Sequence, residues 1–235
     1  MAPLPLLSEE AVRPRLEALC ARLGLDPASP AATLLAEALR RQGDVRLPET
    51  PAGPAIEPSP LQPAATLVTA RLRLRPWRAD DADPYAALCA NPEVMRYVGE
   101  RGPLSREDAW RQLAMLIGHW HLRGFGMWAV EERVTGAFVG RVGLHYPEGW
   151  PDRELAWALA RPFWGRGYAY EAASAALTFA FQTLSWPRVV SLIDPANIRS
   201  IRLAERLGER YHREVMIRAH PVRLYALSRA DWSPA

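Results

Sequence analysis

The sequence predicts an α/β fold, with helices and strands alternating along one main domain. Two observations support this class. Leu72 and Leu74 alternate with charged residues, as in a half-buried strand, and a helical pattern near residues 79 to 90 follows them. Helical and strand patterns then continue to alternate to the end of the chain, which is the order found in mixed α/β proteins. At 235 residues the chain accommodates a domain of about 160 residues and an accessory segment.

The first 46 residues predict a helical hairpin. Residues 8 to 23 carry apolar side chains at helical spacing, and Pro14 is tolerated there only near the start of the helix. Ser29 as N-cap, Pro30 at the first helical position and Gly43 as the stop mark a second helix. Because two short helices have too small an apolar face to fold alone, we expect the hairpin to dock on its own domain or on a partner.

Residues 47 to 65 predict a semi-extended linker. Prolines recur throughout this stretch and leave no room for a helix or a strand ladder, at Pro48, Pro51, Pro54, Pro58, Pro60 and Pro63. The predicted organisation is therefore a helical hairpin at residues 1–46, a proline-rich linker at 47–65, and the main domain at 66–235.

The other elements of the main domain follow from the same periodicities. Thr135 and Gly136 separate two strand-like segments and predict a hairpin turn. Helices are expected near 79 to 90, 105 to 121, 168 to 184 and 197 to 207, and strands near 126 to 132, 136 to 145, 153 to 160, 188 to 193, 209 to 218 and 222 to 228.

Charge and composition exclude several classes of function. Arg71, Arg73 and Arg75 resemble a nucleic-acid-binding stripe, but on a strand they share one face, and we expect a solvated outer face. The net charge is only +3, so no nucleic-acid partner is expected.

No apolar run is long enough for a membrane span, and the N-terminus lacks the basic start of a signal peptide, which favours the cytoplasm. Cys20 and Cys89 have no disulfide or metal spacing, and no metal site is predicted.

The segment from Glu154 to Ala172 predicts an anion-binding turn between a strand and a helix. The amides at a helix N-terminus lack intrahelical partners and attract anions. Gly165 and Gly167 permit the backbone to approach a ligand closely, and Arg166 adds a cation. A tight turn that binds nothing is the alternative. Neither the Gly-Lys-Ser/Thr motif of nucleoside triphosphatases nor the third glycine of a dinucleotide fingerprint is present.

This turn resembles the acyl-coenzyme A loop of the GCN5-related N-acetyltransferase (GNAT) superfamily, Gln/Arg-x-x-Gly-x-Gly/Ala. Trp164 departs from its first position, yet Phe-Trp-Gly-Arg-Gly-Tyr-Ala is similar to the branch that includes the ribosomal-protein N-terminal alanine acetyltransferases. Asn197 to Gly208 resembles the family's Asn-x-x-Ser block, and residues 69 to 77 its first strand. The resemblance covers about residues 66 to 232 and implies a mixed, mostly antiparallel twisted sheet of about six to seven strands flanked by helices.

The resemblance implies acetyl-coenzyme A as the donor substrate. The backbone of the turn would cradle its pyrophosphate with Arg166 at a phosphate, and the Leu159 N–H would pair with pantetheine or polarise the thioester carbonyl. Asn197 would hydrogen-bond the pantetheine arm. The residues expected to bind the donor are Leu159, Gly165, Arg166, Gly167, Tyr168, Ala169 and Asn197.

The sequence indicates the proton-transfer groups less clearly than it indicates the donor-binding residues. Glu154 matches a position where family members carry a carboxylate, and nearby tryptophans would raise its pKa; a surface carboxylate is the alternative. His145 and His220 are candidate bases, although a histidine in such a place more often has a structural role. The family often has a tyrosine where this chain has Ala204, so either Ser200 or a water would protonate the leaving thiolate, or its protonation is unassisted.

The predicted activity is direct attack of a primary amine on acetyl-coenzyme A in a ternary complex. The acceptor is a small-molecule amine or a protein N-terminus, and the branch resemblance slightly favours the latter. A second copy of the chain, forming a homodimer, is a further candidate partner. Two alternatives stay open: a non-catalytic acyl-coenzyme A binding or sensor module, and an interaction protein that acts through its N-terminal tail.

Overall fold

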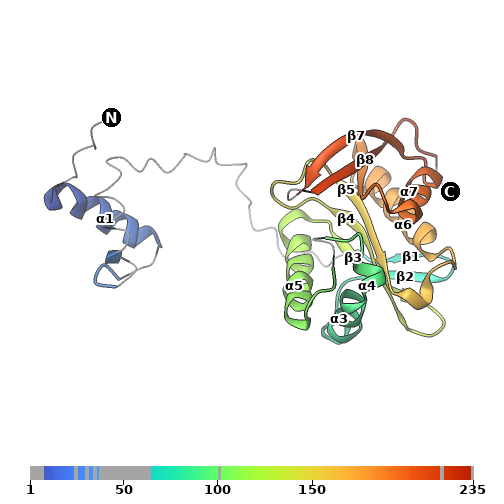
Figure 1. Ribbon diagram of the computed structural model, residues 1–235, viewed down its shortest axis with the longest axis horizontal. Helices are drawn as coiled ribbons and strands as arrows, with labels where there is room; N and C mark the ends of the chain where they lie inside the picture. The colour runs from blue at the N-terminus through green and yellow to red at the C-terminus, as the bar shows by residue number, and fades with distance from the viewer. Residues whose placement is uncertain are drawn as a thin grey trace. The chain divides into compact units, whose positions relative to one another are not determined.

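Figure 1 shows a computed structural model of the chain, which describes residues 8–23, 26–29, 32–33, 36, 65–99, 102–217 and 220–233. The chain divides into two compact units, Met1–Glu57 and Pro58–Ala235. Most of the second predicted N-terminal helix and nearly all of the predicted linker lie outside the described residues. The boundaries 1–46, 47–65 and 66–235 therefore stay predictions.

The first unit contains the helix that the N-terminal pattern predicts, α1 (Glu9–Leu23). Val12 and Cys20 are its buried side chains among those described, and Pro14 lies in its second turn. Ser29 acts as an N-cap as expected, because its hydroxyl accepts a hydrogen bond from the Ala32 N–H at 3.2 Å.

The second unit is built on one eight-stranded sheet with the order β1-β2-β3-β4-β5-β6-β8-β7. All neighbouring pairs are antiparallel except β5 and β6, which are parallel. The sequence predicted about six to seven strands; the additional one has only two residues, too few for a periodic pattern. The strands are β1 (Leu67–Val68), β2 (Leu72–Arg75), β3 (Met127–Glu132), β4 (Phe138–His145), β5 (Glu154–Leu159), β6 (Arg188–Ile193), β7 (Arg210–Ile217) and β8 (His220–Ser228).

Helices cover both faces of this sheet, with α3 and α5 on one side and α6 on the other (Figure 1). None of the described helices is long and apolar enough to cross a membrane. The helices predicted near 79 to 90, 105 to 121, 168 to 184 and 197 to 207 are confirmed. The short α4 was missed because four residues give no periodicity. The helices are η1 (Ala79–Asp81), α3 (Ala82–Ala90), α4 (Pro92–Met95), α5 (Arg106–Arg123), η2 (Arg161–Phe163), α6 (Tyr168–Thr178), the π-helical turn η3 (Phe179–Thr183) and α7 (Ile198–Arg206).

The arginines of β2 do not form the solvated face that the sequence predicted. Arg75 is buried and binds both oxygens of Asp81 at 2.7 and 2.8 Å, and its Nε donates to Glu131 at 2.7 Å. These carboxylates stabilise the guanidinium and raise its pKa further above its usual range. Arg73 also pairs with Glu131, at 2.8 Å. The expectation was wrong at Arg75 because the carboxylates that neutralise it come from η1 and β3.

The parallel pair β5 and β6 meets at only one register position. Glu154 pairs with Val190, and the Val190 N–H donates to Arg153 O at 2.9 Å. Beyond this point the two strands continue without ladder bonds to each other, so the sheet opens between them. Side chains bond some of the β5 backbone groups on this side, as Ser191 Oγ does by donating to Leu155 O at 2.8 Å, and the opening positions the candidate site.

Candidate active site

The glycine-containing turn after β5 has the backbone conformation expected for an anion site. Gly165 and Gly167 have φ values of +75° and +79°, and Gly167 is the N-cap of α6. Space is open around Gly165, where an added Cβ would meet no atom within 4 Å. The free amides at the start of α6 therefore border an accessible region.

The turn is held by the residues that directly precede β2. Arg71 Nη1 donates to Arg166 O at 2.9 Å, and Arg71 Nε pairs with Glu171 at 2.6 Å. Thr69 Oγ1 donates to the same Glu171 carboxylate at 2.6 Å, and the Arg71 guanidinium lies 4.6 Å from the centre of the Tyr168 ring. These contacts fix the turn's backbone before any ligand binds.

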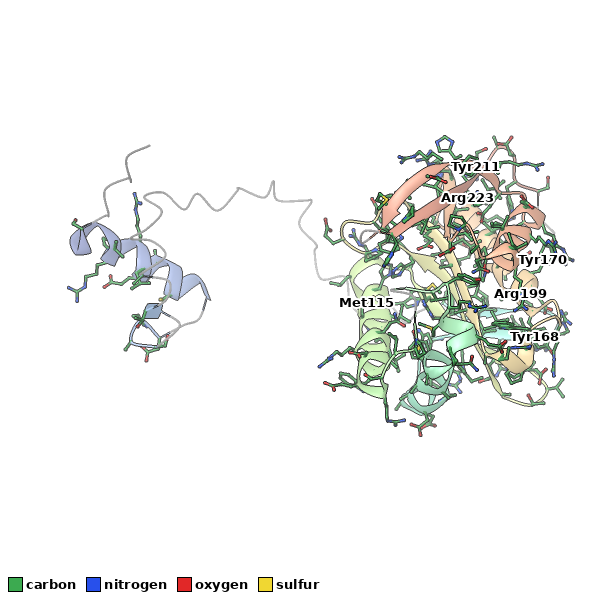
Figure 2. All side chains as sticks on the ribbon, in the orientation of Figure 1. Met115, Tyr168, Tyr170, Arg199, Tyr211 and Arg223 are labelled. Carbon is green, nitrogen blue, oxygen red and sulfur yellow. The ribbon has the colours of Figure 1, made fainter. Side chains whose placement is uncertain are left out.

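A cavity of about 570 Å³ lies between the turn and α7. Gly165, Gly167, Tyr168 and Ala169 line it, as predicted for donor-binding residues. Figure 2 labels Tyr168 and Tyr170 of α6 and Arg199 of α7, all of which contribute to this lining.

Arg166 is placed differently from its expected position at a phosphate. Its guanidinium lies over the Phe163 ring at 5.4 Å and 3.9 Å from Glu132, and the residue is not part of the cavity lining. Four arginines do line the cavity: Arg96 at the end of α4, and three from one face of α7, Arg199, Arg202 and Arg206. The spacing of the last three, by three and four residues, places them on one side of the helix.

Leu159 lies where its N–H can serve a ligand. The neighbouring Ala160 N–H donates to Val139 O at 2.9 Å, so by the alternation of an antiparallel ladder the Leu159 N–H faces away from β4, toward the opening beside β6. Its carbonyl accepts a hydrogen bond from Trp164 Nε1 at 2.8 Å. Trp164, the residue that departs from the family pattern, thus ties the turn to the end of β5.

Asn197 and Ser200 lie together at the start of α7. Asn197 Oδ1 caps the helix by accepting from the Ser200 N–H at 3.2 Å, which leaves its amide group for a ligand. Ser200 Oγ accepts from Trp157 Nε1 at 3.2 Å, so its own hydroxyl proton can be donated elsewhere. Both residues also line a second, smaller cavity of about 240 Å³.

Glu154 lies in this second cavity and is buried, with 7% of its surface exposed. Burial raises its pKa to about 7; hydrogen bonds from Trp150 and the Leu192 backbone and the charge of Arg141 act in the opposite direction. Trp150 Nε1 donates to Glu154 Oε2 at 2.8 Å. The surface alternative for Glu154 is therefore wrong, and the carboxyl group titrates near neutral pH.

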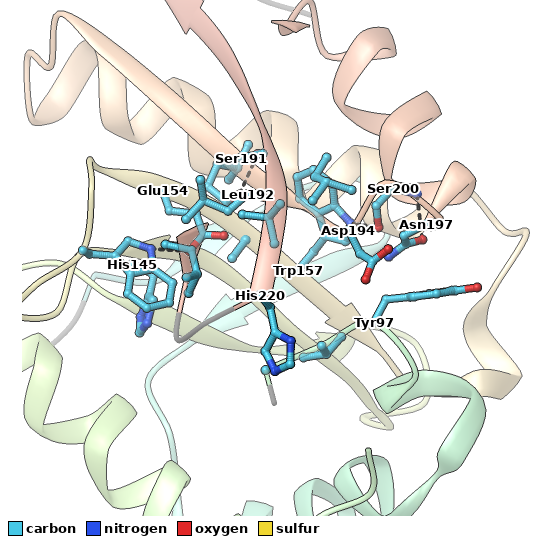
Figure 3. Close-up of a pocket in the computed structure, with 18 of the residues that line it drawn as sticks. Tyr97, His145, Glu154, Trp157, Ser191, Leu192, Asp194, Asn197, Ser200 and His220 are labelled. Carbon is cyan, nitrogen blue, oxygen red and sulfur yellow. Dashed lines mark hydrogen bonds between the residues drawn. The ribbon is translucent and has the colours of Figure 1, made fainter. Parts of the chain in front are cut away.

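The histidines divide into two kinds. His145 and His220 both line the cavity that contains Glu154, and His145 is opposite Glu154 on the neighbouring strand (Figure 3). His119 is structural: its Nε2 accepts from the Tyr146 N–H at 2.9 Å, while Nδ1 lies 2.8 Å from Phe125 O. Burial lowers the pKa of His119.

The predicted residues other than Arg166 surround one continuous region. Figure 3 shows Glu154 and His145 at one end of the smaller cavity, with Asn197 and Ser200 at the other. Trp157, Asn197 and Ser200 line both cavities, so the donor cavity and the cavity with the ionisable groups adjoin.

Sequence reasoning missed other groups near this region. Glu209 is fully buried behind β6, where it lies 2.9 Å from Ser191 Oγ, and burial raises its pKa. Tyr97 lines both cavities from the residues after α4, and Arg141 lines the smaller one from β4. A cation within the otherwise apolar strand from Phe138 was the available signal for Arg141.

A family model described as an acetyltransferase (GNAT) domain matches residues 71–210. The chain therefore belongs to the GNAT family and is an N-acetyltransferase, whose family uses acetyl-coenzyme A as donor.

Similar proteins agree with this assignment. The uncharacterised Bacillus subtilis protein YkkB is 32% identical over 167 residues, which cover 68% of this chain and 93% of that protein. An acetyltransferase structure from Agrobacterium tumefaciens matches with a TM-score of 0.65 at 32% identity, over 71% of this chain and 95% of the other. The ribosomal-protein-S5-alanine acetyltransferase of Vibrio fischeri shares the fold, with a TM-score of 0.58 at 16% identity, over 72% of this chain and 100% of the other.

Proposed function

We propose that this N-acetyltransferase moves the acetyl group of acetyl-coenzyme A to a primary amine by direct attack in a ternary complex, with Glu154 as general base. The acceptor is a small-molecule amine or a protein N-terminus. The supporting observation is the buried Glu154 carboxyl group, with its pKa near 7, in a cavity that adjoins the donor cavity.

The donor would bind along the opening between β5 and β6. Amides at the start of α6 would receive the pyrophosphate, and the arginines of α7 would add positive charge beside it. Pantetheine would extend past the free amide of Asn197 toward Leu159. There the Leu159 N–H would stabilise the negative charge that develops on the thioester oxygen.

The proton balance uses two groups on opposite sides of the reacting carbon. The acceptor arrives as an ammonium ion, and the Glu154 carboxylate takes one proton to give the nucleophilic amine. The nitrogen attacks the carbonyl carbon, the C–S bond breaks, and the thiolate leaves. Ser200 would donate its hydroxyl proton to the thiolate and recover one from the solvent. The attacking nitrogen would lose its second proton to water, and Glu154 would release the first one to the solvent.

The roles proposed for the other predicted residues follow from their positions. His145 and His220 line the acceptor side and stay candidates for relaying the proton from Glu154 to solvent. Arg166 stays a candidate for a phosphate contact, which its half-exposed side chain would have to reach by leaving Phe163 and Glu132.

Initial-rate kinetics would test the direct attack. Varying acetyl-coenzyme A against an accepted amine should give intersecting double-reciprocal lines, and intact-mass analysis should show no acetylated protein when the amine is omitted. Parallel lines together with an acetyl-enzyme would contradict the ternary complex. Glu154→Gln should lower kcat by about 100- to 10,000-fold and leave donor affinity unchanged.

A further inference from the structure

Arg141 lies on the same sheet face as Glu154. In the β4–β5 ladder, Arg141 is opposite Ala158, and His145 is opposite Glu154. Because side chains alternate between faces, Arg141, His145 and Glu154 all point toward the side covered by α3 and α5. Only the small residues Gly143 and Ala156 occupy the ladder position between them on this face.

Residues at both ends of this face of the β4–β5 ladder line the same cavity. Arg141, Ala156 and Glu154 are among its lining residues. The two charged residues are separated by four positions along the ladder, which corresponds to about 13 Å of backbone. The side chains of Arg141 and Glu154 both extend into this space. A molecule of the size of an amino acid fits between the guanidinium of the one and the carboxyl group of the other.

Arg141 lacks a partner within the described part of the chain. Its Nε is buried and has no hydrogen-bond partner, and none of the ion pairs found among the described residues involves it. Arg75 provides the contrast, because that buried guanidinium has two carboxylates within 2.8 Å. Arg141 is half-buried, and its buried Nε is the guanidinium atom for which no acceptor is present among the described residues.

This arrangement is unfavourable for a protein that binds nothing there. An arginine cannot shed its proton to escape burial, and an unsatisfied charged donor costs more than a neutral one. The other ionisable groups of the cavity are Tyr97, His145, Glu154, Asp194 and His220. Glu154 is the carboxylate on the same face, and Arg141 acts on its pKa only through its charge.

We propose that Arg141 binds a carboxylate of the acceptor, so that the acceptor is a small amine that also carries a carboxylate, as an amino acid does. This inference rests on the proposed function, because it requires the amine to lie at Glu154 while the carboxylate lies at Arg141. A planar guanidinium can bind both oxygens of a carboxylate at once, which would orient the amine toward the thioester.

Paired acceptors test the inference. The common α-amino acids, their carboxamides and the corresponding amines without the carboxyl group would be compared by kcat/KM, with coenzyme A release as the assay. The wild-type enzyme should prefer the carboxylate-bearing member by about 10- to 100-fold, the range expected for one charge-assisted contact. Arg141→Gln should remove this preference by losing activity only on the carboxylate-bearing members.

Two controls separate recognition from damage to the fold. Arg213 is an exposed arginine of β7 outside the lining of both cavities, so Arg213→Gln should keep the wild-type preference. Arg141→Lys keeps the positive charge but not the planar guanidinium that binds two oxygens, and it should retain part of the preference for the carboxylate. Calorimetry should show the same acetyl-coenzyme A affinity in all three variants.

Several outcomes would overturn the inference. The first is equal or greater activity of the wild-type enzyme on the carboxamides. The second is a preference for the carboxylate that Arg141→Gln leaves unchanged, which would mean that only water occupies the site at Arg141. The third is a panel in which no carboxylate-bearing amine is acetylated. Failure of the proposed function gives a different result: Glu154→Gln would then keep wild-type kcat on whichever amine is accepted.

Discussion

Trp150 Nε1 donates a hydrogen bond to Glu154 Oε2 at 2.8 Å, and the same indole packs edge-on against His145 at 5.3 Å. The tryptophan therefore has two opposing effects on the carboxyl group. It contributes to the burial that raises the pKa of Glu154, and its N–H stabilises the ionised form, which lowers the pKa. Burial is the larger effect, so this pKa reaches about 7.

The first prediction concerns the pH dependence of turnover. A general base acts in its deprotonated form, so kcat/KM should rise with pH and level off above the Glu154 pKa of about 7. Trp150→Phe removes the hydrogen bond to the ionised form and should move this rise to higher pH. A profile in which the wild type and Trp150→Phe rise at the same pH near 5 would show that another group is titrating.

The second prediction separates the cost of burying Glu154 from its use in catalysis. Its pKa is about 7 in the folded protein, against 4.5 for an exposed glutamate, so the folded state binds more protons between these pH values. Unfolding free energy should therefore fall as pH rises through this window, by up to about 3 kcal/mol from this group.

Glu154→Gln lacks this ionisation and should be more stable than the wild type at pH 8 but equally stable near pH 4. Chemical denaturation of both proteins across this range is the measurement. The account of a raised pKa fails if the wild type is the more stable protein at pH 8.

The third prediction concerns the donor site. Gly167→Trp should abolish acetyl-coenzyme A binding in calorimetry, because the side chain would fill the space beside the α6 amides and a positive φ disfavours any residue with a Cβ. Gly136 also has a positive φ of +73°, but it lies outside both cavities. Gly136→Trp is thus the matched control, and wild-type affinity in both variants would refute the donor site.

The fourth prediction concerns the buried ionic cluster of β2. Arg75→Met leaves the Asp81 and Glu131 carboxylates buried without their main partner and should lower the unfolding free energy by about 3 to 5 kcal/mol. Arg73→Met removes a half-exposed arginine from the same Glu131 and should cost less than about 1 kcal/mol. Equal losses in urea denaturation would mean that burial of Arg75 does not matter.

The fifth prediction concerns domain organisation. Deletion of residues 1 to 60 should leave a domain that unfolds cooperatively and retains its coenzyme A release, because the eight-stranded sheet and both cavities lie after this segment. An insoluble truncated chain would instead show that the N-terminal segment belongs to the folded core.

The sequence predicts features that depend on neighbouring residues and misses those that depend on distant ones. The strand of Leu72 and Leu74 and the glycine turn at Gly165 carry local patterns, and both are confirmed as structure. Burial of Arg75 depends on Glu131, which lies 56 positions later, and no local pattern reports that pairing. Burial of Glu209 beside Ser191 is hidden for the same reason.

The candidate site, too, combines features that depend on neighbouring residues with features that depend on distant ones. Proximity of Glu154 to Asn197 and Ser200 could be expected only through the family resemblance, since a parallel pairing of β5 and β6 brings these segments together. The role of Trp164 was not predictable, because its hydrogen bond to Leu159 O depends on how the chain turns after β5. The missing anion of Arg141 emerges only when every neighbour on its sheet face is known.

Product analysis with a labelled donor tests the central claim most directly. The protein would be incubated with a cell extract and acetyl-coenzyme A carrying an isotopically labelled acetyl group, and the products examined by mass spectrometry. Labelled N-acetyl products should form with the wild-type protein, fall strongly with Glu154→Gln and disappear with Gly167→Trp. Label that reaches no amine with the wild-type protein, or that reaches the same amines equally with both variants, would contradict acetyl transfer at this site.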